Sequence, residues 1–348
     1  MKLMSLILLQ LITALFCMAQ SPDPDYVAQR QQFTILGNFK LESGAVIQDC
    51  RIGYRTYGHL NKAKTNGILF PTWFGGNSRD IEAYVNPWKV IDTNRYFLII
   101  ADAFGDGVSS SPSNSVKQHG ALFPPFSIRD MVESQYRLVS IRFGIKHLHA
   151  ILGISMGGMQ TFQWGISYPD FAGRLIPIVG TPQPSSYDLM GYSIFRKIIE
   201  TDTAFNHGNY KVNPIIVAAT MLLEFSVTTP QNKVLTMSRD SFAKWAQKAD
   251  TAKAPDWNDT YYQMMAVIGH DIAKPYHGSL IEAAHHIKAK MLIISSRQDH
   301  LVNPIQAIEF SKMLPARLIV LTTDLGHEAP SFDDPVLQKS IADFLIGD

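Results

Sequence analysis

Residues 149–158 read HAILGISMGG and place Ser155 between two glycines, directly after a short apolar run. The run has the length of a buried strand, and apolar residues recur at helical spacing after the serine. A Gly-x-Ser-x-Gly sequence between a strand and a helix is typical of a nucleophile elbow, a tight turn that exposes the serine Oγ at the end of a sheet. Glycines are needed there because a Cβ would collide with neighbouring backbone. We therefore predict Ser155 as a nucleophile.

Short apolar runs recur along the rest of the chain, separated by helical stretches. They lie at residues 67–71, 96–101, 175–179, 290–295 and 317–321. Continuous apolar strands are typical of a parallel sheet that is covered by helices on both faces. Ser127 can cap one of these helices, which we expect to run to Arg142 and to end at Gly144. The pattern predicts an α/β protein with an open, doubly wound, mostly parallel sheet.

Two segments depart from this alternation. Residues 33–57 alternate apolar and polar side chains and suit an antiparallel edge ribbon. Residues 181–286 are helical in character, with only a weak strand signal at residues 214–218. An insertion of that length is too long for a plain loop. We predict a helical cap at residues 181–286 on an α/β core formed by residues 20–180 and 287–348, and caps of this kind usually shape a substrate pocket.

A nucleophilic serine needs a base and an orienting carboxylate, which follow it on such a sheet in the order acid, then histidine. Two segments fit, SSRQDH at 295–300 and DLGHE at 324–328, each just beyond an apolar strand. We predict His327 as general base and Asp299 as the carboxylate that fixes its tautomer. Three alternatives stay open: His300 as the base, and Asp324 or Glu328 as the orienting acid.

Acyl transfer through a tetrahedral intermediate also needs donors for the oxyanion. The backbone N–H of Met156, directly after the nucleophile, is one expected donor. The second should come from the loop after the apolar run at 67–71, which reads TWFGGN at 72–77 and whose glycines permit close approach to a substrate. We predict Phe74 as this donor, with Trp73 as the alternative and as a candidate substrate contact.

Composition and charge exclude several other classes of protein. The chain has 348 residues, with 31 Lys and Arg against 30 Asp and Glu, which gives a net charge of +1. It has no excess of positive charge to neutralise phosphates, so we do not expect it to bind nucleic acid. Cys17 and Cys50 are too few for a disulfide framework or a cysteine zinc site. His147 and His149 alternate along a predicted strand without an apparent third ligand, so we predict no metal site and no bound cofactor.

The N-terminus has the form of a secretory signal. Lys2 precedes a run from Leu6 to Ala19 that is interrupted by two polar residues, and the chain then turns polar. The run is shorter than the roughly 20 residues of a membrane-spanning helix. We predict a signal peptide at residues 1–19, cleavage after Ala19, no stable membrane insertion afterwards, and a secreted or periplasmic protein. An uncleaved anchor and a buried helix are the alternatives. Cleavage would leave Cys50 as the single cysteine.

Taken together, the motifs resemble the homoserine O-acetyltransferase family of the α/β-hydrolase superfamily. The matching segments are PTWFGG at 71–76, SSSPSN at 109–114, FSIRDMV at 126–132, GISMGGMQ at 153–160, YPD at 168–170, DH at 299–300 and GHE at 326–328. The resemblance implies the α/β-hydrolase fold, a triad of Ser155, Asp299 and His327, an acyl-serine intermediate and ping-pong turnover. Family members are often dimers through the cap, which implies a homodimer here.

Two cap segments resemble the stretch that holds the acceptor amino acid in true acetyltransferases, FRKII at 195–199 and GNY at 208–210. They make Arg196 and Tyr210 candidate substrate-binding residues. Trp73 and Phe74 are bulkier than the Ala-Leu-Thr-Gly or Ala-Leu-Ser-Gly type loop of the biosynthetic members, which suggests a different or narrower acyl pocket. Export would also separate the protein from cytoplasmic homoserine and acetyl-CoA. The sequence therefore predicts an exported hydrolase of a small ester, with an acetyl-CoA-dependent O-acyltransferase and a non-catalytic ligand-binding protein as alternatives.

Overall fold

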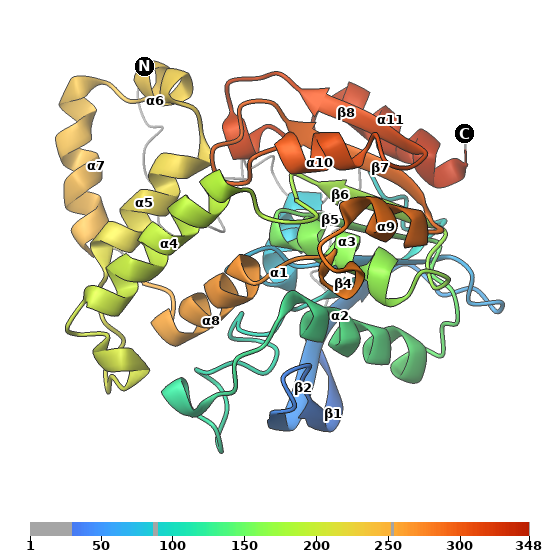
Figure 1. Ribbon diagram of the computed structural model, residues 1–348, viewed down its shortest axis with the longest axis horizontal. Coiled ribbons are helices and arrows are strands. Elements are labelled where there is room, and N and C mark those ends of the chain that lie inside the picture. The colour runs from blue at the N-terminus through green and yellow to red at the C-terminus, as the bar shows by residue number, and fades with distance from the viewer. Residues whose placement is uncertain (1–29, 86–89, 252–253, 348) are drawn as a thin grey trace.

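A mixed sheet forms the centre of the molecule in the computed structural model, which describes residues 30–85, 90–251 and 254–347 (Figure 1). Its eight strands have the order β1-β2-β4-β3-β5-β6-β7-β8. The strands are β1 (Gln32–Lys40), β2 (Val46–Tyr57), β3 (Gly67–Pro71), β4 (Phe97–Ala101), β5 (Ala150–Ile154), β6 (Arg174–Ile178), β7 (Lys290–Ser296) and β8 (Ala316–Leu321). Strands β3 to β8 run parallel to one another. Strand β2 is antiparallel to β4, and β1 is antiparallel to β2. The predicted fold class is confirmed, and the expected ribbon is the β1–β2 hairpin.

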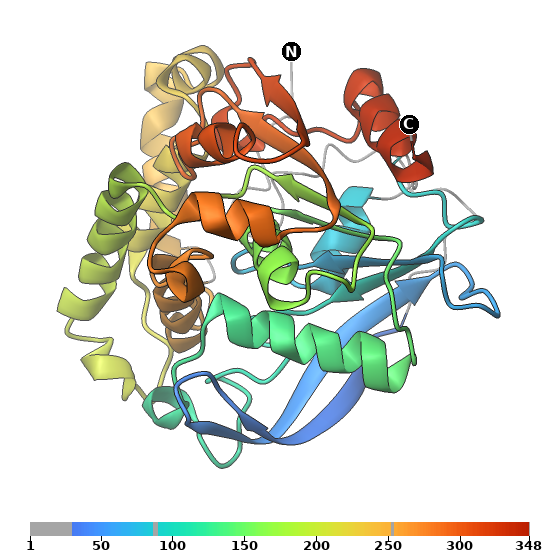
Figure 2. The ribbon, with the colours of Figure 1, turned by 45° about the vertical axis from the view of Figure 1, so that its right-hand side comes forward.

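Helices cover both faces of the sheet, as the continuous apolar strands require. One face carries α2 (Ile128–Arg137), α3 (Met156–Ser167), α9 (Leu280–His286) and α10 (Ile305–Phe310), and the other carries α1 (Ser78–Val85) and α11 (Pro335–Ile346). Figure 2 shows α2, α3 and α9 side by side on the near face. On that face the rings of Phe162 and Phe310 meet edge to face, with their centroids 5.6 Å apart.

The ends of α2 follow from local sequence. The hydroxyl of Ser127 accepts from the backbone N–H of Asp130, and the Asp130 carboxylate accepts from the N–H of Ser127. This reciprocal capping box satisfies two N–H groups that the first turn leaves without intrahelical partners. After Arg137 the chain widens into a π-helical turn at Leu138–Arg142 and leaves it through Gly144, whose φ is +62°. The predicted cap and end of this helix are confirmed.

A helical insertion follows β6 and lies beyond the ends of the strands (Figure 1). Its helices are α4 (Ser186–Thr201), α5 (Val217–Val227), α6 (Pro230–Thr236), α7 (Arg239–Thr251) and α8 (Trp257–Ile268), with short 3-10 turns at Asn206–Gly208 and Lys274–Tyr276. The weak strand signal at 214–218 was misleading, because Val217 begins α5. Helix α9 packs on the sheet through Ala283 and Ala284, so the insertion ends before α9 rather than at residue 286.

The predicted signal peptide at residues 1–19 lies outside the described residues. Within the described ranges, no helix is both long and apolar enough to cross a membrane. Cys50 lies fully buried on β2, where burial raises the pKa of its thiol to about 12. A thiol in that environment packs as a small apolar side chain and is chemically inert.

Candidate active site

Ser155 occupies the turn between β5 and α3 in a strained conformation. Its φ of 59° and ψ of −120° lie outside the regions that residues with a side chain ordinarily adopt. A backbone hydrogen bond stabilises this strained conformation, since the N–H of Ser155 donates to the carbonyl of Ile178 at 2.9 Å. A Cβ on Gly153 would overlap the carbonyl of Gly157, and one on Gly157 would lie 2.6 Å from the Pro71 oxygen. Only glycine fits at both positions.

The structure brings the three residues of the predicted triad into one hydrogen-bonded group. The hydroxyl of Ser155 donates to Nε2 of His327 at 2.9 Å, and Nδ1 of His327 lies 2.6 Å from Oδ2 of Asp299. An ionised carboxylate only accepts hydrogen bonds, so the proton of neutral His327 stands on Nδ1 and leaves Nε2 as the acceptor. The imidazole is therefore oriented to receive a proton from the serine.

Asp299 and His327 lie just beyond the carboxyl ends of β7 and β8, at the edge of the sheet where Ser155 lies. The second carboxylate oxygen of Asp299 accepts the backbone N–H groups of Leu301 and Val302, each at 2.8 Å. Asp299 is only 3% exposed and His327 only 7%. Because every polar atom of the two side chains has a hydrogen-bond partner and both side chains are shielded from water, the imidazole has little freedom to turn.

The charges around His327 favour its protonated form. Burial by itself lowers the pKa of His327, while the charge and the hydrogen bond of Asp299 raise it. The charges of Glu328 and Asp188 raise it further, and the net pKa lies above the ordinary value of histidine. Burial in turn raises the pKa of Glu328 to about 7, although Lys233 and His327 oppose that shift.

The other candidates for base and orienting acid take no part in this group. His300 is exposed to solvent. The carboxylate that contacts the His327 ring is that of Asp299, and Glu328 acts on the ring through its charge. The backbone carbonyl of Asp324 accepts from the hydroxyl of Thr229 in the cap, so this residue helps to hold the histidine loop.

The two predicted oxyanion donors lie on segments that Gln160 joins. The amide nitrogen of Gln160 donates to the carbonyl of Thr72 at 2.9 Å and to that of Met156 at 3.2 Å. In the part of the chain that the structure describes, neither the N–H of Met156 nor that of Phe74 is paired with a hydrogen-bond acceptor. Both N–H groups are therefore available to donate to a ligand.

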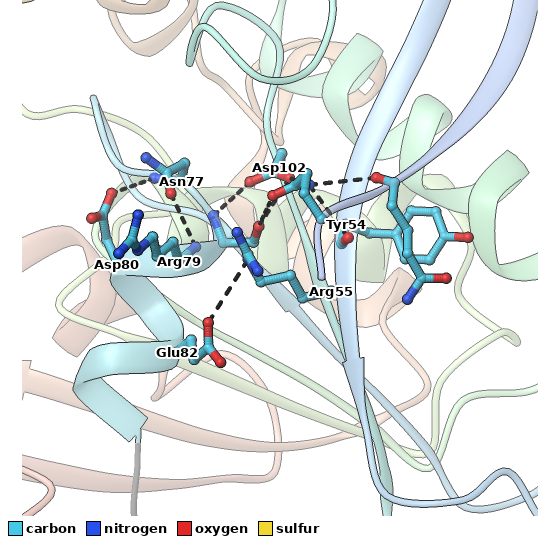
Figure 3. Close-up of polar contacts among 10 residues, drawn as sticks. Tyr54, Arg55, Asn77, Arg79, Asp80, Glu82 and Asp102 are labelled. Carbon is cyan, nitrogen blue, oxygen red and sulfur yellow. Dashed lines mark hydrogen bonds and ion pairs between the residues drawn. The ribbon is translucent and has the colours of Figure 1, made fainter. Parts of the chain in front are cut away.

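The loop at 72–77, called the oxyanion loop below, is tied to the core at both ends. At its start, the N–H of Thr72 donates to the carbonyl of Ala101 at 3.1 Å. At its end, the N–H and hydroxyl of Ser78 donate to the buried carboxylate of Asp102 at 2.5 and 3.0 Å. Figure 3 shows Asp102 beside the first turn of α1, with the ion pair of Arg55 and Glu82 next to it. Burial raises the pKa of Asp102 to about 6, against these hydrogen bonds.

Similarity to known proteins assigns the chain to a family. The model of the alpha/beta hydrolase fold family matches residues 68–334. A homoserine O-acetyltransferase from Methanococcoides burtonii is 30% identical to this chain in an alignment of 361 positions that covers 90% of this chain and 72% of that protein. The chain belongs to the homoserine O-acetyltransferase-like family of the α/β-hydrolase superfamily. The expected resemblance is confirmed.

The relatives of this α/β hydrolase include esterases as well as acetyltransferases. An ethyl acetate hydrolase from Pseudomonas veronii is 30% identical over 293 residues, which cover 80% of this chain and 84% of that protein. The crystal structure of an acetylester hydrolase from Corynebacterium glutamicum matches with a TM-score of 0.83 and 25% identity, over 91% of this chain and 96% of that one. These relatives support an enzyme of the α/β-hydrolase type.

The residues that the family resemblance suggested for substrate binding have other partners in this α/β hydrolase. Arg196 lies on α4 with its Nε 3.5 Å from the Glu200 carboxylate. The hydroxyl of Tyr210 donates to Asp256 and accepts the N–H of Asn258, both at 2.8 Å, and so holds the start of α8. Neither side chain is bonded to the Ser155 group, and their role in binding stays a prediction. Trp73 is buried within the oxyanion loop, where its carbonyl accepts the N–H of Gly76.

The paired histidines have structural partners. Nδ1 of His147 is 2.9 Å from the carbonyl of Asp170, and Nε2 of His149 is 2.7 Å from that of Leu345. Among the described residues, no group of three or more His, Cys, Asp or Glu side chains could hold a metal ion.

Two site residues were not singled out from the sequence. Asp102 anchors the end of the oxyanion loop, and Gln263 of α8 contacts its middle. Each makes its contacts with residues far away in the chain, so no local motif marks either of them.

Proposed function

We propose that this protein is an exported serine esterase that cleaves small esters through an acyl-Ser155 intermediate. The observation that carries the proposal is the continuous hydrogen-bonded path from the Ser155 hydroxyl through His327 to Asp299. Among the described residues, the backbone N–H groups of Met156 and Phe74 are unpaired and lie on two segments that Gln160 joins. Nucleophile, base, orienting acid and oxyanion donors are the parts that acyl transfer by serine requires.

The chemistry follows from these positions. His327 takes the hydroxyl proton through Nε2 while the Ser155 oxygen attacks the acyl carbonyl, and the N–H groups of Met156 and Phe74 bind the resulting oxyanion. His327 then gives the proton to the leaving alcohol, and the acyl group stays on Ser155. A water molecule attacks this ester with His327 again as base, which releases the carboxylic acid and restores the serine.

Two observations support a short acyl group. The ring of Phe74 in the oxyanion loop meets the ring of Phe195 in cap helix α4 edge to face, with their centroids 6.3 Å apart. Aromatic side chains from the loop and the cap therefore take up the space around Phe74. The relatives include an ethyl acetate hydrolase and an acetylester hydrolase. We therefore propose acetyl esters of small alcohols as the substrate class.

The test measures turnover and covalent labelling together. Purified protein given p-nitrophenyl acetate should release p-nitrophenol, and a fluorophosphonate should add to Ser155, as peptide mass spectrometry would show. The Ser155→Ala variant is the control and should do neither. Wild-type protein that neither turns over short esters nor takes the label, yet binds an ester with the same affinity as Ser155→Ala, would instead be a non-catalytic binding protein.

The acetyltransferase relatives support a second candidate, transfer of an acetyl group from acetyl-CoA to an amino-acid hydroxyl. The same acyl-serine would form, and the acceptor would replace water in the second half of the reaction. Supplying acetyl-CoA with homoserine distinguishes the two functions. Formation of O-acetylhomoserine faster than free acetate would favour the transferase, and acetate alone would favour the esterase.

Export and dimer formation are parts of the proposal with separate tests. The apolar run at residues 6–19 supports a signal peptide, and protein recovered from outside the cytoplasm should begin at Gln20. Exposed apolar side chains lie on four cap helices, at Met190, Ile194, Phe225, Leu235 and Phe242. They support a homodimer through the cap, and light scattering of the purified protein should give twice the mass of one chain.

A further inference from the structure

Gln263 of cap helix α8 joins two loops of the core. Its Oε1 accepts the backbone N–H of Gly75 at 2.8 Å, and its Nε2 donates to the carbonyl of Phe104 at 2.9 Å. The side chain is fully buried. One planar amide thus bridges the oxyanion loop and the loop that follows β4, so the two loops are held at a fixed separation.

The bond to Gly75 acts directly on the peptide next to the predicted oxyanion donor. Gly75 has a φ of +70°, and a glycine can change from this φ to others at little energetic cost. The peptide that carries the Gly75 N–H shares the α-carbon of Phe74 with the peptide that carries the Phe74 N–H. Holding the first peptide therefore limits rotation of the second, whose N–H must point toward the acyl oxygen.

The middle of the oxyanion loop is held from the cap, whereas its ends are held from the core. Thr72 and Ser78 bond to the core residues Ala101 and Asp102. Gly75 lies between these ends, and the side chain that fixes it comes from α8, 188 residues later in the chain. The position of α8 is therefore transmitted to the middle of the oxyanion loop, next to the predicted donor Phe74.

The residues around Gln263 leave space for its side chain. A Cβ on Gly105 would lie 3.0 Å from Cγ of Gln263 and 2.8 Å from Cζ of Phe126, so the absence of a side chain at Gly105 makes room for the glutamine. Four residues earlier on α8, the carboxylate of Asp259 accepts the N–H of Ser113 at 2.8 Å and its hydroxyl at 2.5 Å. These contacts seat one face of α8 firmly on the core.

We propose that Gln263 is a positioning residue for the oxyanion loop, through which the cap sets the rate of acyl transfer and not only the choice of substrate. This inference rests on the proposed esterase function. Interactions that act only in the transition state change kcat, whereas ground-state contacts change KM. Displacing an oxyanion donor by a fraction of its hydrogen-bond length is enough to lower the rate strongly.

The test replaces Gln263 by two side chains of similar size that cannot hydrogen-bond, in Gln263→Leu and Gln263→Met. With p-nitrophenyl acetate we expect kcat to fall about tenfold to a hundredfold and KM to change less than about twofold. Inhibition by a trifluoromethyl ketone, which forms an oxyanion when Ser155 adds to it, should weaken by the same factor as kcat/KM. Gln263→Glu in its protonated form keeps an acceptor for the Gly75 N–H and a donor for the Phe104 carbonyl, so it should lose less than Gln263→Leu.

Thr260→Val provides the matched control, because Thr260 is buried on the same helix and its hydroxyl bonds within α8 to the carbonyl of Asp256 at 2.9 Å. It should keep kcat and inhibitor affinity. Active-site titration with a phosphonate corrects each rate for the fraction of folded protein, and Gln263→Met serves if the leucine variant does not fold. Wild-type protein without esterase activity would overturn the proposed function itself. Active wild type whose Gln263 variants keep kcat and inhibitor affinity, or lose them only as far as Thr260→Val does, would overturn the role of Gln263.

Discussion

The Oγ of Ser155 lies 2.9 Å from Nε2 of His327, although 172 positions separate the two residues in the chain. The sheet makes this contact possible, because β5 and β8 are parallel members of one sheet and their carboxyl ends face the same edge. The helical insertion lies between the two strands in sequence but beyond the sheet edge in space. Ser155 is thus bonded to a histidine of the core, and the loop that carries this histidine is bonded in turn to Thr229 of the cap.

Removing the carboxylate that orients His327 should cost most of the activity. In Asp299→Asn the amide can donate to Nδ1, which would favour the tautomer whose proton stands on Nε2, so the histidine could no longer accept from Ser155. We expect kcat for p-nitrophenyl acetate to fall roughly 10⁴-fold. Asp324→Asn is the matched control and should stay within about twofold, because that carboxylate does not contact the imidazole. Equal losses in the two variants would contradict the assignment of Asp299.

The pH dependence of kcat/KM should report the raised pKa of His327. The histidine acts as a base only when neutral, so activity should be lost as the pH falls through its pKa, with a midpoint above the ordinary value of 6.5. The negative charge of Glu328 is one cause of the rise. Glu328→Gln should therefore move the midpoint to lower pH. A midpoint that is unchanged or higher in this variant would show that Glu328 does not act on His327.

Much of the fold could be predicted because each strand and turn has a local cause. The short, mainly apolar runs form β3 to β8, and Ser127 caps α2 as its sequence indicates. Asp299 and His327 could be predicted to lie with Ser155 because this architecture fixes their order after the serine and places both beyond strand ends. The inserted helices were harder to predict, since the apolar run at 214–218 suits a strand as well as the start of α5.

The residues that could not be predicted act through contacts that have no local pattern. Gln263 is one polar residue in an amphipathic helix, and its partner Gly75 lies 188 positions earlier. Val179 adopts a φ of 40°, unusual for a β-branched residue, where the chain leaves β6 beside the elbow. Packing of the completed fold imposes this conformation, and the sequence around Val179 gives no sign of it.

Alanine at two glycines should have opposite effects on stability. In Gly153→Ala the new Cβ would overlap the backbone of Gly157, which cannot move without breaking the elbow. We expect a loss of more than about 3 kcal/mol in the free energy of unfolding. Gly191 lies in α4, where an added Cβ would have no other atom within 4 Å, so Gly191→Ala should gain roughly 0.5–1 kcal/mol from helix propensity. Urea denaturation measures both, and a gain in Gly153→Ala would contradict the elbow geometry.

The contact of α8 with the core should depend on pH through Asp259. Burial raises its pKa to about 7 from an ordinary value of 3.8, and the charge of Asp256 adds to the rise, while the hydrogen bonds from Ser113 oppose it. Because the folded pKa is the higher one, the folded protein binds the proton more tightly than the unfolded chain. This contribution to stability is fully present below about pH 4 and is lost as the pH rises through about 7.

Asp259→Asn isolates that contribution, because a neutral amide can bond to Ser113 at any pH. The variant should gain stability relative to wild type between pH 5 and pH 8, as the free energies of urea unfolding at the two values would show. Asp240→Asn, at an exposed position on helix α7 of the cap, is the surface control against which the Asp259→Asn difference is compared. If the Asp259→Asn difference were the same at pH 5 and pH 8, Asp259 would not titrate differently in the folded and unfolded chain, and the seat of α8 on the core would be independent of its charge.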